Sequence, residues 1–195
     1  QAWQQAQTPT APHAPAERTF DADTPGTFST HTFSNGAGQR QYKLYVPAVY
    51  ANEPLPLIVM LHGCTQSIDE FAEGTRMNVL ADRYGFAVVY PEQSKHVHAH
   101  RCWHWYDAGE SAGGAEARAV VSLVDALVAQ HGFDSERVYV AGISAGAGLA
   151  ALLAVNYPEH FAAVALHSGP AFGEARSGIT AMDVMRRGAR AYRAA

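Results

Sequence analysis

The sequence predicts an α/β fold: a doubly wound, mostly parallel sheet with helices on both faces. From about residue 27 onward, short apolar runs alternate with longer amphipathic segments, which is the pattern of βαβ units. Several of the short runs are almost continuously apolar, as expected of parallel strands that are covered on both sides. The chain has 195 residues, enough for one domain with a sizeable core.

Composition narrows the classes of protein and of partner. Hydrophobic residues make up 48% of the chain and charged residues 16%, a globular composition. The net charge is −4 and the basic residues form no stripe, so we expect no nucleic-acid partner. Because no apolar run approaches the ~20 residues that cross a bilayer, we expect no membrane partner either. Residues 1–26 are predicted to be a flexible arm and residues 27–195 the folded domain.

Five segments are predicted strands. The first alternates polar and apolar residues before Pro47, which is typical of an outer, antiparallel strand. The others are predominantly apolar, as expected of interior strands. In chain order, the predicted strands are Gln41–Val46, Leu55–Leu61, Phe86–Tyr90, Arg137–Ala141 and Phe161–His167.

The helices are predicted from apolar periodicity and from capping residues. Ser67 and Glu70 match a capping box, which satisfies the free amides at a helix start. Gly85 occupies the place of a C-cap glycine, so one helix is expected between them. The predicted helices are residues 67–85, residues 115–131, a small-residue segment from the Gly142 turn to Tyr157, and about residues 179–190.

The segment Gly142-Ile-Ser-Ala-Gly146 matches Gly-x-Ser-x-Gly, the nucleophile elbow of α/β hydrolases. In that motif a strand turns at once into a helix, and the serine hydroxyl stands above the sheet edge in a strained backbone conformation. Neighbouring side chains would collide at such a turn, so glycines stand two residues before and after the serine. An ordinary glycine-rich helix start is the simpler alternative. The strand pattern before the motif and the helix pattern after it favour the elbow, which predicts Ser144 as the nucleophile.

The loop His62-Gly-Cys-Thr-Gln66 directly follows a predicted buried strand. In α/β hydrolases a loop at this place gives one backbone N–H to the oxyanion hole, and the residue after the nucleophile gives the other. The candidates are therefore the amides of Cys64 and Ala145, which would stabilise the negative charge of a tetrahedral intermediate. A polar turn with a structural histidine is the alternative. We prefer the oxyanion loop, because it lies upstream of the elbow where the fold requires it.

Blocks that are spread along the chain carry a family resemblance. They are Leu57–Gln66, Gly74–Asn78, Val89–Gln93, Arg101–Trp103 and Arg137–Gly146. In this order they resemble the poly(3-hydroxybutyrate) depolymerase family of esterases over about residues 30–190. The resemblance implies an α/β-hydrolase fold, no metal or other cofactor, and hydrolysis of 3-hydroxyalkanoate polyesters or small oligomer esters. Related members act on feruloyl or acetylated plant esters.

The resemblance also bears on the cysteines. The chain has two, Cys64 and Cys102, and the number alone leaves open a disulfide or two free thiols. The family pattern implies that they pair, which would hold the tryptophan loop beside the oxyanion loop. A disulfide favours export to an oxidising compartment, secreted or periplasmic, over the cytoplasm.

Two loops supply candidates for a substrate pocket. Trp103 and Trp105 could line the mouth of an ester pocket, or they could cover the end of the sheet. His62 and Gln66 are the candidates from the oxyanion loop. The alternating histidines of the loop after the third strand suggest a metal only weakly, because no carboxylate or cysteine pattern accompanies them. We expect a solvated loop at His96, His98 and His100.

Two positions depart from the family pattern without touching the nucleophile. His104 stands where the family usually has Asn, and Ala147 stands where it usually has a second glycine after the elbow. A larger departure concerns the triad, whose acid and histidine follow the serine in this fold. The family places both beyond the strand Phe161–His167, and the sequence ends at Ala195 before them.

We therefore expect the triad acid and histidine to be missing from this chain. The remaining candidates are poor substitutes and receive no catalytic role: His160, His167 and Asp183. A serine without a base is a weak nucleophile. The same shortening would leave Phe161–His167 as an apolar edge strand with unpaired backbone groups. We expect a missing C-terminal segment, a second polypeptide or a dimer partner to cover it.

Three alternatives to a polyester depolymerase stay open. The first is another carboxylesterase of the feruloyl or acetylxylan type, which a panel of ester substrates would separate. The second is a hydrolase-fold binding protein without turnover, in which the serine would not react with a fluorophosphonate. The third is a fragment that is inert alone and active once it is joined to its other half.

Overall fold

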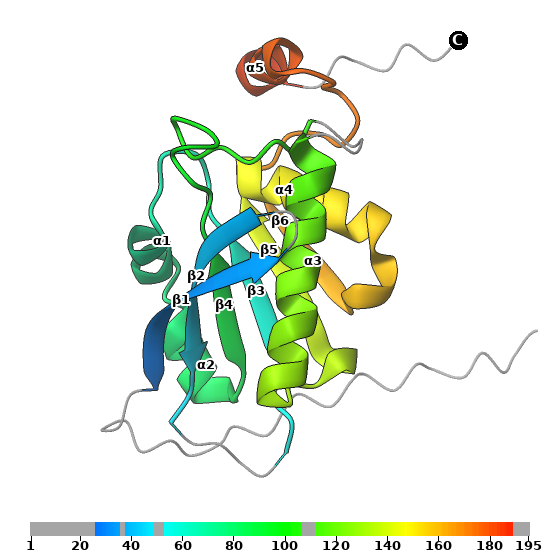
Figure 1. Cartoon of the computed structure of the whole chain (residues 1–195). Coiled ribbons are helices and arrows are strands. Elements are labelled where there is room, and N and C mark those ends of the chain that lie inside the picture. The colour runs from blue at the N-terminus through cyan, green and yellow to red at the C-terminus, as the bar shows by residue number, and fades with distance from the viewer. Residues whose placement is uncertain (1–25, 36–37, 49–52, 107–111, 189–195) are drawn as a thin grey trace, which may run out of the picture.

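The structure, a computed structural model, describes residues 26–35, 38–48, 53–106 and 112–188. The arm predicted over residues 1–26 lies outside these ranges except for Gly26. The described residues form a six-stranded sheet in the order β1-β2-β4-β3-β5-β6, with helices packed on it (Figure 1). The α/β class with a mostly parallel sheet is therefore confirmed.

The parallel part of the sheet contains the predicted interior strands. In this part, each strand of the series β4-β3-β5-β6 pairs in parallel with the next. The pairs β1-β2 and β2-β4 are antiparallel. The strands are β1 (Thr27–Asn35), β2 (Gly38–Val46), β3 (Leu57–Leu61), β4 (Ala87–Pro91), β5 (Val138–Ile143) and β6 (Ala163–His167).

One strand escaped prediction. The sequence of β1, TFSTHTFSN, consists mainly of Ser, Thr and other polar residues, and it buries little of its surface. Its stability comes from a nine-residue ladder with β2, from Thr27 opposite Val46 to Asn35 opposite Gly38. The predicted outer strand is thus the second one in the sheet, and β1 is the edge.

The helices are α1 (Ile68–Thr75), α2 (Met77–Tyr84), α3 (Ala112–His131), α4 (Ala145–Asn156) and α5 (Gly178–Arg187), with short 3-10 turns at Ser135–Arg137 and Pro158–His160. The single helix predicted over residues 67–85 was wrong, because Arg76 adopts a left-handed conformation with φ 53° and separates α1 from α2. The Arg76 N–H still caps α1 by donating to the Ala72 carbonyl at 3.0 Å. The predicted caps, Ser67 and Gly85, are both present.

Alternate residues of the central strands point to opposite faces of the sheet, and each face has its own core. Leu57, Val59 and Leu61 of β3 belong to the core under α3 and α4. Met60 of β3 instead belongs to a smaller core with Phe71 of α1. This two-sided cover explains why β3 and β4 are almost continuously apolar.

The last strand is much less covered. β6 forms one edge of the described sheet, and most of its residues are exposed. Leu166 exposes 56% of its surface. Beyond it, α5 lies apart from the body of the sheet in Figure 1 and buries only Ala181 and Val184. Among the described residues, no helix is long and apolar enough to cross a membrane.

Candidate active site

Ser144 lies at the junction between β5 and α4. β5 ends at Ile143 and α4 begins at Ala145, so the serine is the only residue in the turn. Its backbone is at φ 55° and ψ −121°, a conformation that a residue other than glycine adopts only when its surroundings enforce it. Two hydrogen bonds do so: the Ser144 N–H donates to the His167 carbonyl at 3.0 Å, and its carbonyl accepts from the Gly148 N–H at 3.1 Å.

The glycines of the motif make this turn sterically possible. A Cβ atom on Gly142 would come within 2.3 Å of the Gly146 carbonyl oxygen. A Cβ atom on Gly146 would come within 2.1 Å of the Leu61 carbonyl oxygen. Both glycines are therefore required, because they let the first turn of α4 lie directly against the ends of β5 and β3. Gly169 plays a related part, since its missing Cβ leaves room for the Ala147 side chain that departs from the family pattern.

The loop after β3 approaches the same serine. A Cβ atom on Gly63 would lie 3.4 Å from Ser144 Cβ, so the loop backbone adjoins the serine. No described residue accepts a hydrogen bond from the Cys64 amide or from the Ala145 amide. The Ala145 amide also lies at the N-terminus of α4, where the helix dipole favours negative charge. Two amides that donate to no described residue thus belong to the loop and the helix start that adjoin Ser144.

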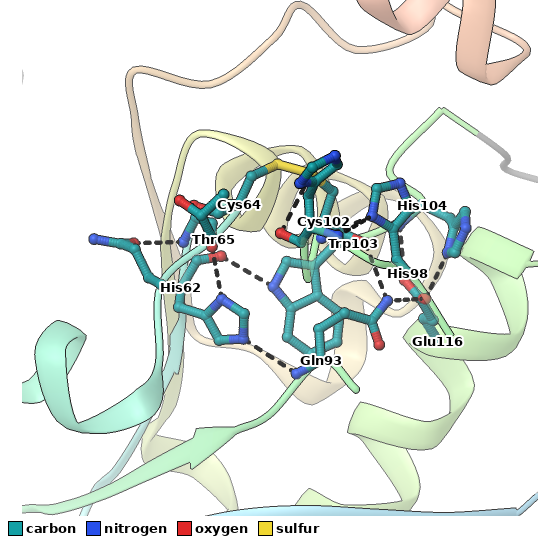
Figure 2. The surroundings of a disulfide bond; sticks show 12 residues. His62, Cys64, Thr65, Gln93, His98, Cys102, Trp103, His104 and Glu116 are labelled. Atoms are coloured by element: carbon teal, nitrogen blue, oxygen red, sulfur yellow. Dashed lines mark hydrogen bonds and ion pairs between the residues drawn. A yellow bond between two sulfur atoms is a disulfide. The ribbon is translucent and has the colours of Figure 1, made fainter. Parts of the chain in front are cut away.

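A disulfide between Cys64 and Cys102 joins this loop to the tryptophan loop (Figure 2). Further bonds join the same two loops. The Thr65 N–H donates to the His100 carbonyl at 2.6 Å, and the Trp103 indole N–H donates to the His62 carbonyl at 3.0 Å. The tryptophan loop therefore holds the loop that would form the oxyanion hole through one disulfide and two hydrogen bonds.

The predicted pocket residues are mostly interior. His62 exposes 1% of its surface, Trp103 0% and Trp105 5%. Trp105 packs against Gly148 of α4: a Cβ atom on Gly148 would come within 2.5 Å of the Trp105 Cβ atom. The side chain of Gln66 is also engaged, because its Oε1 accepts the Gly63 N–H at 2.7 Å. A role of these residues in lining a pocket stays a prediction. In the structure Trp103 and Trp105 belong to the main core, and the side chains of His62 and Gln66 bind the backbone of Gly63.

Sequence reasoning missed a buried polar cluster behind the oxyanion loop (Figure 2). Gln93 is fully buried and donates from Nε2 to the Cys102 carbonyl, at 3.1 Å, and to Glu116. Glu116, on α3, exposes 4% of its surface and accepts the backbone N–H and the Nδ1–H of His104 at 2.8 and 2.7 Å. Helical spacing was an available signal: Glu116 precedes Val120 by four residues and so continues the buried stripe of α3.

The described residues supply no base for Ser144. No described residue makes a hydrogen bond with its Oγ. His167 Nδ1 lies 3.1 Å from the hydroxyl of Ser168 instead. His160 lies near carboxylates, 3.1 Å from Glu159 and 3.5 Å from Asp125, and Asp183 pairs with Arg187 at 2.9 Å.

The histidine-rich loop also has a structural explanation. His98 Nδ1 accepts the backbone N–H groups of His100 and Cys102, both at 3.3 Å, and so shapes the loop that ends in the disulfide. Burial lowers the pKa of His98, and the nearby His104 and His100 lower it further. Within the described ranges, no group of three or more His, Cys, Asp or Glu side chains could hold a metal ion.

Comparison with known proteins decides the family. The family described as Esterase PHB depolymerase matches residues 40–195. The chain belongs to this family of esterases. It is 35% identical over 158 residues to the poly(3-hydroxyalkanoate) depolymerase C of Paucimonas lemoignei, covering 80% of this chain and 37% of the relative. It is 36% identical over 144 residues to feruloyl esterase B of Neurospora crassa, covering 73% of this chain and 48% of the relative.

A solved structure of an esterase has the same fold. The acetyl xylan esterase from Aspergillus awamori superposes with a TM-score of 0.66 at 27% identity, over 78% of this chain and 56% of that one. The chain therefore spans 37% to 48% of the two curated relatives named above and about half of this structure. The resemblance inferred from the sequence blocks is confirmed.

Proposed function

We propose that the protein is a serine carboxylic-ester hydrolase in which Ser144 attacks the ester carbonyl. The observation that carries this proposal is one strained serine at a strand–helix turn, adjoined by a loop and a helix start whose Cys64 and Ala145 amides donate to no described residue. Such donors stabilise the oxyanion of acyl transfer. The acyl group would pass to Ser144 Oγ as the alcohol leaves, and water would then release the acid and restore the serine.

We further propose that the substrates are poly(3-hydroxybutyrate) or oligomer esters of 3-hydroxyalkanoates. The family match and the similarity to a depolymerase support this choice. A feruloyl or acetylxylan esterase is the second candidate, favoured by relatives of those names at similar identity. Hydrolysis of polyester film and soluble 3-hydroxybutyrate oligomers, compared with that of feruloyl and acetylated sugar esters, would separate the two.

The base that activates Ser144 is proposed to come from a segment that packs on the edge of β6. The lack of a base among the described residues and the exposure of this strand support the idea. A segment of the same protein is the preferred source, because the relatives are longer than this chain. The disulfide favours an exported protein, since such bonds persist in oxidising compartments.

The serine mechanism is tested with Ser144→Ala. In the protein that includes the segment supplying the base, we expect the wild type to hydrolyse short p-nitrophenyl esters and the variant to lose at least about 10³-fold in kcat, as expected when a triad nucleophile is removed. Ser168→Ala is the matched control, because Ser168 also has a positive φ yet lies at the end of β6. Ester hydrolysis that survives in Ser144→Ala would refute the proposal.

A further inference from the structure

His62 is held in one protonation state by its two neighbours. Its Nδ1 lies 2.7 Å from the Gly63 carbonyl oxygen, which can only accept a hydrogen bond, so Nδ1 carries the proton. Its Nε2 lies 3.1 Å from the backbone N–H of Gln93, which can only donate, so Nε2 is unprotonated. The ring is therefore neutral. Burial lowers the pKa of His62 more than the bond to Gly63 raises it, and this also favours the neutral ring.

The bond to Gly63 acts on the proposed oxyanion donor directly. The carbonyl of Gly63 and the N–H of Cys64 belong to the same planar peptide group, and in a trans peptide they point in opposite directions. Gly63 itself could rotate freely, because it has no side chain to restrict its backbone. An imidazole that holds the carbonyl on one side therefore aims the Cys64 N–H to the other.

We propose that His62 is a positioning residue, whose imidazole orients the Gly63–Cys64 peptide so that the Cys64 amide stays aimed at the oxyanion. This inference rests on the proposed function. It accounts for a buried histidine that touches no described triad residue and that exposes only 1% of its surface.

The same proposal explains the buried polar cluster. Gln93 provides the N–H that fixes the His62 tautomer, and its side chain is in turn held at both ends. Its Nε2 binds Glu116 and the Cys102 carbonyl, and its Oε1 accepts from Arg40 Nη1 at 3.2 Å (Figure 2 shows all but Arg40). Because the Gln93 side chain is hydrogen-bonded at both its oxygen and its nitrogen, this buried network specifies one arrangement, which is what a preorganised donor needs.

Two polar substitutions separate orientation from simple support, because each keeps one of the two bonds. In His62→Asn the side-chain amide takes the place of Nδ1, so the bond to the Gly63 carbonyl is kept and the bond from Gln93 is lost. In His62→Gln the amide reaches the place of Nε2, so the bond from Gln93 is kept and the bond to Gly63 is lost. Neither variant changes Ser144 or the two amides.

The measurement is kcat and KM for a p-nitrophenyl ester. It uses the protein that includes the segment supplying the base, and active serines are counted by fluorophosphonate titration. We expect His62→Asn to stay within about 3-fold of the wild-type kcat. We expect His62→Gln to lose about 10- to 100-fold in kcat with KM nearly unchanged, a part of the 10²–10³ that a whole oxyanion donor is worth. The affinity for a trifluoromethyl ketone, which forms the oxyanion adduct, should fall in parallel.

Equal kcat values for the two variants would overturn the proposal, because a merely supporting histidine would lower stability without distinguishing them. Should His62→Gln fail to fold, His62→Asn decides alone: a loss above about 10-fold in kcat per titrated serine contradicts the proposal. The outcomes remain separable from the proposed function. A wild type that neither hydrolyses esters nor labels at Ser144 defeats both, whereas an active wild type with equal variants defeats only the role of His62.

Discussion

The segments on the two sides of Ser144 differ in how firmly the rest of the protein holds and covers them. On the side of β3, the oxyanion loop is held by a disulfide, by the Trp103 indole and by a buried polar cluster. On the side of β6, the strand is largely exposed and α5 buries only two residues. The comparison teaches that the loop proposed to stabilise charge is firmly held among the described residues, whereas no described residue is placed to move a proton from Ser144.

The largest expected contrast is between two leucines at the ends of these strands. Leu61 of β3 is fully buried and Leu166 of β6 is 56% exposed. Leu61→Ala should cost about 2–5 kcal/mol of unfolding free energy, because it leaves a cavity, and Leu166→Ala under about 1 kcal/mol. Urea unfolding of the chain measures both. Equal losses would break the comparison, since they would mean that a surface already covers β6 in solution.

Two glycines give the next contrast. Gly146→Ala places a Cβ atom within 2.1 Å of the Leu61 carbonyl, so backbone must move. We expect a loss of about 1–3 kcal/mol of stability and at least a 10-fold loss of esterase activity. Gly74→Ala in α1 is the control: its Cβ meets nothing within 4 Å, and a helical alanine should stabilise by about 0.5–1 kcal/mol. Wild-type activity in Gly146→Ala would contradict the tight packing of α4 on β3.

The sharp turn at Ser144 and the interior strands could be predicted from the sequence because their signals are local. Gly-x-Ser-x-Gly specifies its own turn, and a strand covered on both faces is apolar at every position. β1 was missed because most of its residues are polar and exposed, and its nine-residue ladder with β2 is not visible in the local sequence. The break at Arg76 was missed because a left-handed conformation is uncommon for residues other than glycine, so an arginine gives no signal for it in the sequence.

The arrangement around Ser144 was predictable to a similar extent. Motif positions predict Ser144, Cys64 and Ala145 as the site, and the structure brings the turn of Ser144 and the loop of Cys64 together, while their catalytic roles stay predictions. The contact between Gln93 and Glu116 could not be predicted from a motif. Gln93 lies in the loop after β4 and Glu116 lies in α3, so the two side chains meet only in the folded protein. The burial of His62 could not be predicted either, since sequence does not reveal whether a polar side chain at a strand end faces outward or inward.

The smallest expected effects come from the two capping boxes, Ser67 on α1 and Ser177 on α5. Ser67→Ala should cost about 1 kcal/mol of global stability, whereas Ser177→Ala should only fray α5, which carries little core. Amide hydrogen exchange distinguishes global from local opening. A global loss in Ser177→Ala would mean that α5 is integral to the fold.

The capping box of α1 also predicts a pH dependence. Hydrogen bonds from the backbone and side chain of Ser67 hold the pKa of Glu70 below its ordinary value of 4.5. Because the folded pKa is lowered, the contribution to stability is present above pH 4.5 and is lost as the pH falls through the folded pKa. An NMR titration of Glu70 should show its pKa rising toward the ordinary value in Ser67→Ala. An unchanged pKa would contradict the role of the cap.

The central claim is that Ser144 faces an oxyanion hole made by the Cys64 and Ala145 amides. The most direct test is a crystal structure of the protein after reaction with a phosphonate ester, which mimics the tetrahedral intermediate. We expect phosphorus bonded to Ser144 Oγ and one phosphoryl oxygen about 2.7–3.1 Å from both amide nitrogens. An unmodified Ser144, or a phosphoryl oxygen directed away from these two amides, would contradict the claim.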